Sequence, residues 1–171
     1  MKIYEEGLEE HPKITIIFGN FMMLLWLALG TIACRFVHPL IGWFYLTFAL
    51  LMVYVVLRKI VCTNCYYYGK WCPSGWGKLS ALFFKKGNIE NFSTSVGIKL
   101  APMTYGLLTV IPVILLIVSL FLKFSMPKII VLVLLFLISF YSGGISRTKS
   151  CIRCKMRLMC PGCAVKNPET K

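Results

Sequence analysis

Four stretches of the chain consist almost entirely of apolar residues and contain no charged side chain. They are residues 14–34, 40–57, 100–122 and 129–145. A helix needs about 20 apolar residues to cross the hydrocarbon core of a bilayer, with about 17 as the lower limit. The pattern therefore predicts an all-α integral membrane protein with four transmembrane helices.

The connections between these apolar stretches differ in length. Residues 35–39 join the first pair and residues 123–128 join the second, so we expect each pair to form a helical hairpin. A much longer segment separates the two pairs. The predicted organisation is an N-terminal segment, a first transmembrane hairpin, a loop with an interfacial part, a second transmembrane hairpin and a C-terminal tail, at residues 1–13, 14–57, 58–99, 100–145 and 146–171.

The basic residues are distributed unevenly between the connections. The chain has 19 Lys and Arg against six acidic residues, and its net charge is +13. Only Arg35, Lys123 and Lys128 lie in the two short turns. Since basic loops stay on the inner side of a membrane, both termini and the long loop are predicted to be cytoplasmic, in the cell (plasma) membrane. Positive-inside topology and attraction to anionic membrane lipid account for the charge, so we predict no nucleic-acid partner.

Two parts of the long loop have a distinct composition. Residues 76–86 mix apolar residues with lysines, which is typical of a short helix in the membrane interface, although a loop packed on the helix ends has the same pattern. Residues 88–95 are polar and are expected to be irregular. A set of five aromatic residues in the loop fits an interfacial belt or, alternatively, the lining of a site for a quinone-like lipid-soluble carrier. Its members are Tyr66, Tyr67, Tyr68, Trp71 and Trp76.

Seven of the eight cysteines form a repeated pattern that follows each predicted hairpin. In both places a CxxC pair is followed, after five or six residues, by a Cys-Pro dipeptide. The first set is Cys62, Cys65 and Cys72, and the second set is Cys151, Cys154, Cys160 and Cys163. The matched motif predicts an internal repeat whose two hairpins have the same orientation. The eighth cysteine, Cys34, is expected to be a small buried apolar residue.

This cysteine pattern favours metal binding. Stable disulfides are disfavoured because the cytoplasm is reducing. Two residues between cysteines let both thiolates point at one centre. Structural zinc sites place their CxxC pairs about 12–20 residues apart, whereas a Cys-Pro after CxxC resembles the ligand runs of bacterial ferredoxins. We therefore expect iron–sulfur clusters of the 4Fe-4S type, with zinc as the alternative.

The two sets differ in their number of ligands. The second set has four cysteines and can complete a site alone, but the first has three. A fourth ligand could be water, a residue of a partner subunit, His11, or Cys163 donated across the repeat axis. A dithiol relay through the pairs Cys62–Cys65 and Cys151–Cys154 is a further alternative, and it would require lowered thiol pKa values.

Other functional classes lack their characteristic residues in this sequence. The apolar stretches contain neither histidines for a membrane haem nor charged groups for ion transport. We therefore predict an electron-transfer subunit rather than a complete enzyme. It would pass electrons between a soluble donor and a lipid-soluble carrier or other redox subunits, within a larger membrane complex of an anaerobe. The alternative is a zinc-stabilised membrane scaffold without redox activity.

Overall fold

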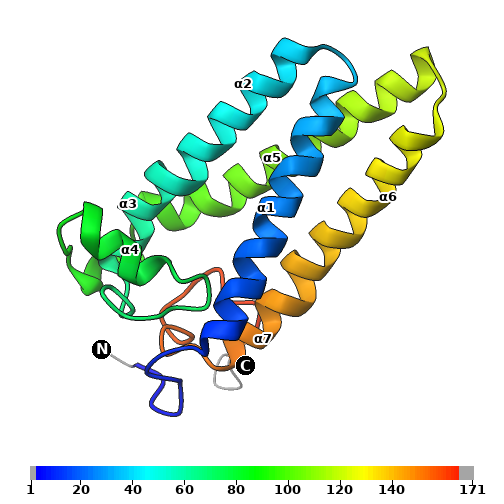
Figure 1. Ribbon diagram of the computed structural model, residues 1–171. Coiled ribbons are helices and arrows are strands. Elements are labelled where there is room, and N and C mark those ends of the chain that lie inside the picture. The colour runs from blue at the N-terminus through cyan, green and yellow to red at the C-terminus, as the bar shows by residue number, and fades with distance from the viewer. Residues whose placement is uncertain (1–2, 166–171) are drawn as a thin grey trace.

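The computed structural model describes residues 3–165, and over that range its regular elements are all helices (Figure 1). Four of its helices are long and apolar enough to cross a membrane, as in a multi-pass membrane protein. These four spans are Lys13–Arg35, Pro39–Asn64, Val96–Leu122 and Met126–Ile152. Three basic residues that the sequence places on the inner side, Lys2, Lys166 and Lys171, lie outside the described residues.

Two of the spans are single α-helices and two are composite. The first span is α1 (Lys13–Arg35) and the third is α5 (Val96–Leu122). The second span consists of α2 (Pro39–Leu50), the π-helical turn η1 (Leu51–Val56), α3 (Leu57–Val61) and the 3-10 turn η2 (Cys62–Asn64). The fourth consists of α6 (Met126–Phe140), the π-helical turn η4 (Tyr141–Ser146) and α7 (Arg147–Ile152).

The composite spans continue past their apolar stretches into the cysteine motifs. Cys62 therefore begins the last turn of the second span, and Cys151 lies in the last turn of the fourth. The π-helical turn η1 ends at Val56, six residues before Cys62. In the fourth span η4 ends at Ser146, five residues before Cys151. Isolated π-helical turns are rare in proteins, and those that do occur are often at functional sites.

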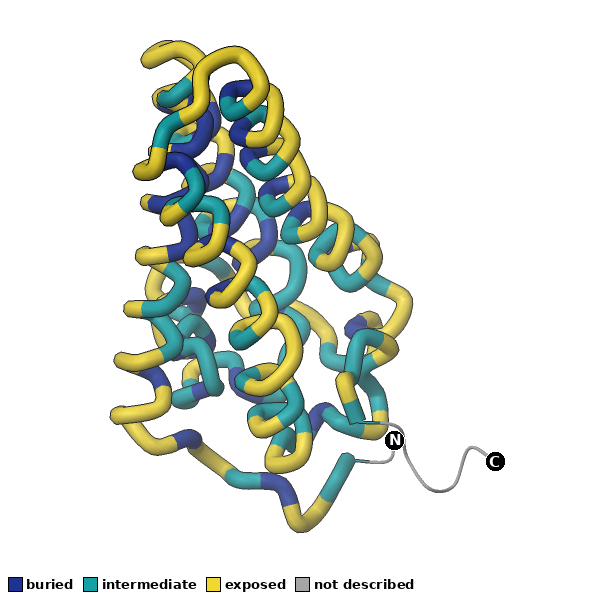
Figure 2. The backbone as a smooth tube through the Cα atoms, turned by 90° about the vertical axis from the view of Figure 1, so that its right-hand side faces the viewer, coloured by how far each residue is buried: buried dark blue, intermediate teal, exposed yellow. Residues whose placement is uncertain are grey.

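Helix α1 lies at the centre of the bundle and contacts α2, α5 and α6 (Figure 1). Fully buried residues from all four spans form the core, among them Leu27, Val53, Leu116 and Leu135. The outward faces of the spans are exposed, as the tube in Figure 2 shows, and many of the exposed side chains are large and apolar. Such faces suit a lipid environment, where apolar surface carries no cost.

A buried tyrosine compensates for a proline inside α5. Pro112 has no N–H, so the carbonyl of Leu108 one turn earlier loses its helical partner. The Tyr45 hydroxyl of α2 donates to that carbonyl oxygen at 2.8 Å. Gly30 of α1 makes room, because a Cβ there would overlap the Tyr45 hydroxyl. Bonds of this kind from a neighbouring helix are what makes proline tolerable in a membrane span.

A buried lysine closes the end of the bundle away from the cysteine motifs. Lys128 is 7% exposed, and its ammonium group donates to the carbonyl oxygens of Ser119 at 2.8 Å and Lys123 at 2.9 Å. Carbonyls at the end of a helix carry partial negative charge, and the Lys123 carbonyl lies beyond the last residue of α5. The lysine therefore satisfies the end of α5 and holds α6 against it.

Between the end of the second span at Asn64 and the start of the third at Val96, the long loop contains one regular helix, α4 (Trp76–Phe83), and one 3-10 turn, η3 (Ile89–Asn91). The helix falls within the predicted interfacial segment 76–86. Residues 88–95 are irregular apart from the 3-10 turn and another turn. The loop lies at the same end of the bundle as the N-terminal segment and the start of the tail (Figure 1).

Replacing Tyr45 by Phe should destabilise the bundle by about 1–3 kcal/mol, since it leaves the buried Leu108 carbonyl without a partner. Adding Pro112→Ala to Tyr45→Phe should recover most of that loss, because the alanine N–H can bond to the same carbonyl. Reversible unfolding in mixed detergent micelles measures both changes. A double variant no more stable than Tyr45→Phe would contradict this account of the tyrosine.

Candidate metal centre

Three segments meet at the end of the bundle that carries both cysteine sets, which we call the inner end because the sequence predicts it to be cytoplasmic. We name them the N-terminal segment (residues 3–12), the first cysteine segment (62–77) and the second cysteine segment (151–165). The N-terminal segment bonds to the second cysteine segment through Leu8 N–H and the Arg153 carbonyl, at 3.0 Å. It bonds to the first through His11 N–H and the Trp71 carbonyl, at 2.9 Å. A short chain segment thus connects the two cysteine segments.

Tyr67 lies where these three segments meet and is 1% exposed. Its hydroxyl donates to the Leu8 carbonyl at 2.7 Å and accepts the Lys155 N–H at 3.1 Å. The His11 ring packs against it with 5.6 Å between centroids. Burial raises the pKa of Tyr67, so its hydroxyl remains a neutral donor at physiological pH.

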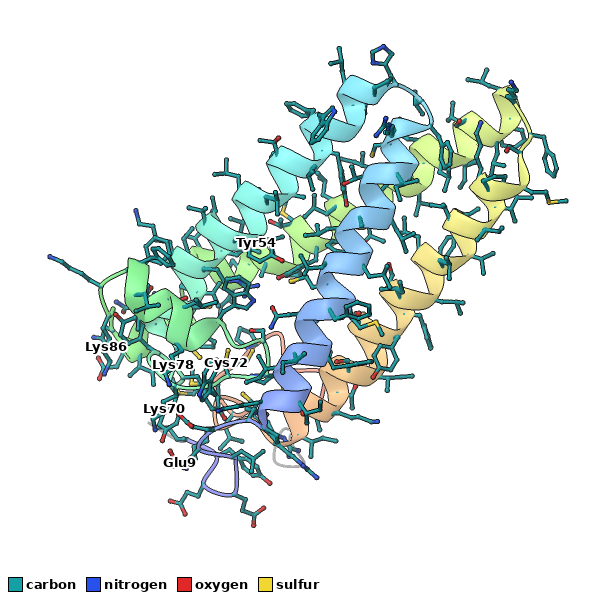
Figure 3. All side chains as sticks on the ribbon, in the orientation of Figure 1. Glu9, Tyr54, Lys70, Cys72, Lys78 and Lys86 are labelled. Atoms are coloured by element: carbon teal, nitrogen blue, oxygen red, sulfur yellow. The ribbon has the colours of Figure 1, made fainter. Side chains whose placement is uncertain are left out.

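Glu9 connects the same segments at the surface. Its carboxylate pairs with Lys70 of the first cysteine segment at 2.9 Å and with Lys155 of the second at 2.5 Å. It also accepts a hydrogen bond from Tyr66 at 2.7 Å. Hydrogen bonds from Lys155, Lys70 and Tyr66 hold the pKa of Glu9 down at about 2. Figure 3 shows Glu9 and Lys70 near each other.

Cys72 lies at the start of α4 and accepts hydrogen bonds there. The Gly77 N–H donates to its sulfur at 3.3 Å, and the Ser74 hydroxyl oxygen lies 3.3 Å from it. Position 77 requires glycine, because a Cβ there would overlap the Tyr67 carbonyl oxygen.

Three further cysteines have a backbone N–H facing the sulfur from two residues along the chain. These pairs are Cys65 with Tyr67, Cys154 with Met156, and Cys160 with Gly162. The first two pairs occupy equivalent places in the two sets. Such donors stabilise a thiolate, the form that binds metal. As free thiols these groups are disfavoured from ionising, since burial raises the pKa of Cys154 to about 11.

Arg58 brings a buried positive charge to the first set. It is 8% exposed, and its guanidinium stacks over the Trp76 ring at 4.6 Å. Both Arg58 and the Ser80 hydroxyl face the Cys62 thiol. Nevertheless Arg58 Nε, Arg58 Nη2 and Ser80 Oγ are buried without a hydrogen-bond partner among the described residues. Within those residues the two ion pairs both belong to Glu9, so Arg58 has no carboxylate to balance it.

The two cysteine sets are neighbours. Cys65 lies within electrostatic reach of Cys62 and Cys72 and also of Cys154. Cys154 is in turn close to the other three members of the second set. Among residues 3–165 no three His, Cys, Asp or Glu side chains converge closely enough to hold a single metal ion. All the cysteines in this structure are free thiols.

The predicted ligands differ in where the structure places them. Cys163 lies near Cys151 and Cys160 of its own set, and the residue of the second set that approaches the first is Cys154. His11 is 6% exposed, and its Nε2 has no hydrogen-bond partner among the described residues. Burial and the charge of Arg153 lower its pKa, which favours the neutral imidazole that a metal requires. Cys34 is buried in the core, as expected.

The dithiol relay finds no support in this environment. A relay needs thiols with lowered pKa values. Burial instead raises the pKa of Cys65 and of Cys154, although the surroundings are rich in basic residues. Basic charge alone therefore does not predict thiol reactivity here.

Several residues that shape the site could not be identified from the cysteine pattern. Glu9, Arg58, Ser80 and Gly77 act through contacts between segments far apart in the sequence. Two of them stand out in the sequence: Glu9 is one of only six acidic residues, and Arg58 is the first charged residue after an apolar stretch. Ser80 and Gly77 do not.

No protein-family model matches this chain, and neither a curated protein nor a solved structure matches it.

The Glu9 ion pairs should make the contact between the three segments depend on pH. Because the pKa of Glu9 is lower in the folded protein, its contribution is full above about 4.5 and is lost as pH falls toward about 2. Hydrogen exchange of the Leu8 amide should show protection falling in that window. At neutral pH Glu9→Gln should reduce the protection, whereas Glu10→Gln, which removes neither ion pair, should not. Equal protection in both variants would rule out the role given to Glu9.

Gly77→Ala should destabilise the inner end of the protein by about 1–3 kcal/mol, because the new Cβ forces α4 away from the Tyr67 carbonyl. Gly106→Ala is the matched control, since a Cβ there meets nothing within 4 Å. Thermal unfolding in detergent compares them. Unchanged stability in Gly77→Ala would mean that the close approach is not required.

Proposed function

We propose that this protein is an electron-transfer subunit whose seven inner cysteines hold iron–sulfur clusters at the cytoplasmic face of the cell membrane. The alternative is that the same thiolates bind zinc. One-electron transfer is the chemistry that such clusters supply when bound. The chain's own contribution is to hold the thiolates, balance their charge and exclude water.

The observation that carries the proposal is the buried Arg58 beside Cys62. A buried charge without a counter-charge costs several kcal/mol. With neutral thiols, the stacking on Trp76 offsets only part of that cost. Thiolates bound to a metal centre carry the missing negative charge, and sulfur atoms can accept hydrogen bonds from the guanidinium and from Ser80. The orphaned donors thus fit an anionic centre bound by the first set.

The equivalence of the two halves supports two centres rather than one. Both composite spans have a π-helical turn that ends five or six residues before the first cysteine. In both, the second cysteine of the CxxC faces the N–H group two residues further on. We infer an internal repeat of two helical hairpins that places Cys65 and Cys154 next to each other. Two centres in those positions could exchange electrons directly.

The surface beside the first set suits a soluble acidic donor. A depression of about 530 Å³ borders Cys65, and Lys70 and Lys86 are among its lining residues. Figure 3 shows both lysines at the same end of the protein as Cys72. Positive charge at such a place accelerates encounter with an acidic redox protein. The excess of basic residues on this side of the spans supports a cytoplasmic position for this surface.

Analysis of protein purified without oxygen from cells supplied with iron tests the proposal. We expect iron and acid-labile sulfide in equal amounts, and a paramagnetic signal after reduction. Cys65→Ser should remove one centre and leave the other. Stoichiometric zinc without sulfide would establish the scaffold alternative instead, and absence of both metals would overturn metal binding altogether.

Arg58→Gln should lower the reduction potential of one centre by tens of millivolts, because the arginine charge stabilises the more negative, reduced state. Lys59→Gln is the control, since Lys59 is exposed and its charge is screened by water. Redox titration followed by electron paramagnetic resonance measures the shift. Equal potentials in the two variants would contradict the pairing of Arg58 with the centre.

A further inference from the structure

An apolar groove lies between α1 and the second span, next to the first cysteine segment. Its volume is about 380 Å³. Its sides are mainly apolar, with Leu24 from α1 and Leu50 from the second span among them. These residues belong to membrane spans, so a molecule dissolved in the lipid can enter the groove from the side.

The inner end of the groove is aromatic. Tyr54, Trp71 and Trp76 line it, and the Tyr54 ring meets the Trp76 ring edge-on at 4.7 Å between centroids. The Trp76 indole N–H is buried and has no hydrogen-bond partner among the described residues. A ligand with a flat ring would pack against these aromatic side chains, and a carbonyl oxygen on it is the kind of acceptor that the indole N–H lacks.

This aromatic end adjoins Cys72. Trp71 and Ser74 lie on either side of Cys72 in the chain, and both line the groove. The Asn20 amide of α1 donates to the Ser74 carbonyl at 3.0 Å, which fixes the first cysteine segment against the groove wall. In Figure 3, Tyr54 lies beside the membrane-spanning helices, and Cys72 lies below it at the end of the bundle that carries the cysteines.

We propose that the groove binds the head of an isoprenoid quinone, with its tail running into the lipid along α1 and α2. A phospholipid acyl chain would fill the apolar part but would leave the indole N–H without a partner. Arg58 does not line the groove, but it stacks on Trp76, which does, and so adds positive charge near a ring that is anionic after its first electron and before it takes up protons.

The redox part of this inference rests on the proposed function. Reduction of a bound quinone to its quinol takes two electrons and two protons. The electrons would come one at a time from the reduced acidic protein at the basic surface, by way of the centre at Cys72, and the protons from interfacial water. Binding itself requires no metal, so it can be tested separately.

Photolabelling of the protein in lipid nanodiscs tests the binding. The probe is a benzoquinone with a decyl tail and an azido group, and labelled peptides are located by mass spectrometry. We expect labelling within residues 71–79 and on the facing part of α1. An excess of unlabelled decyl benzoquinone should abolish it. Labelling involves no electron transfer. If the protein contains no iron but is still labelled at these residues, the proposed function is wrong and the quinone site stands.

The matched variants are Leu79→Trp and Leu82→Trp. Leu79 lines the groove, whereas Leu82, on the same helix α4, is 75% exposed and outside it. Leu79→Trp should fill the groove and reduce labelling to background, and Leu82→Trp should leave it unchanged. Labelling spread along the lipid-facing surface, equal in both variants, would overturn the quinone site. So would competition by phosphatidylglycerol as effective as that by quinone.

Discussion

The inner end of this protein is organised around a buried positive charge that no carboxylate balances. Arg58 is held between the Trp76 ring and the Cys62 thiol. Desolvating a guanidinium is expensive, and the usual compensation is an ion pair. Here the available compensation is sulfur. The free energy of folding at this end therefore depends on whether the thiols ionise, and a bound metal centre is what makes buried thiols ionise.

The contacts around the cysteines join parts of the chain that are far apart in sequence. Glu9 and Tyr67 hold the first and second cysteine segments together, so Cys65 and Cys154 become neighbours. The basic depression is lined by Cys65, and the apolar groove is lined by Trp71 and Ser74, which flank Cys72 in the chain. In our proposal electrons enter from the aqueous side and leave into the lipid.

The sequence was sufficient for the four membrane-spanning helices, because uncharged stretches of this length have few other solutions. It was less informative about their ends. The second and fourth spans run on through Cys62 and Cys151, since a helix can continue after its apolar stretch has ended. The local motif identified the seven candidate ligands, which stay a prediction. The roles of Arg58 and Gly77 depend on tertiary contacts, which no local pattern encodes.

The central claim is that the inner cysteines bind iron as thiolates in clusters. Mössbauer spectroscopy of protein purified without oxygen from cells grown on ⁵⁷Fe tests it most directly, because the spectrum reports the ligands and the valence of every iron atom. Our account predicts iron in tetrahedral sulfur coordination with valence shared between atoms, as in 4Fe-4S clusters. A spectrum without protein-bound iron, or with iron bound only by oxygen and nitrogen, would contradict it.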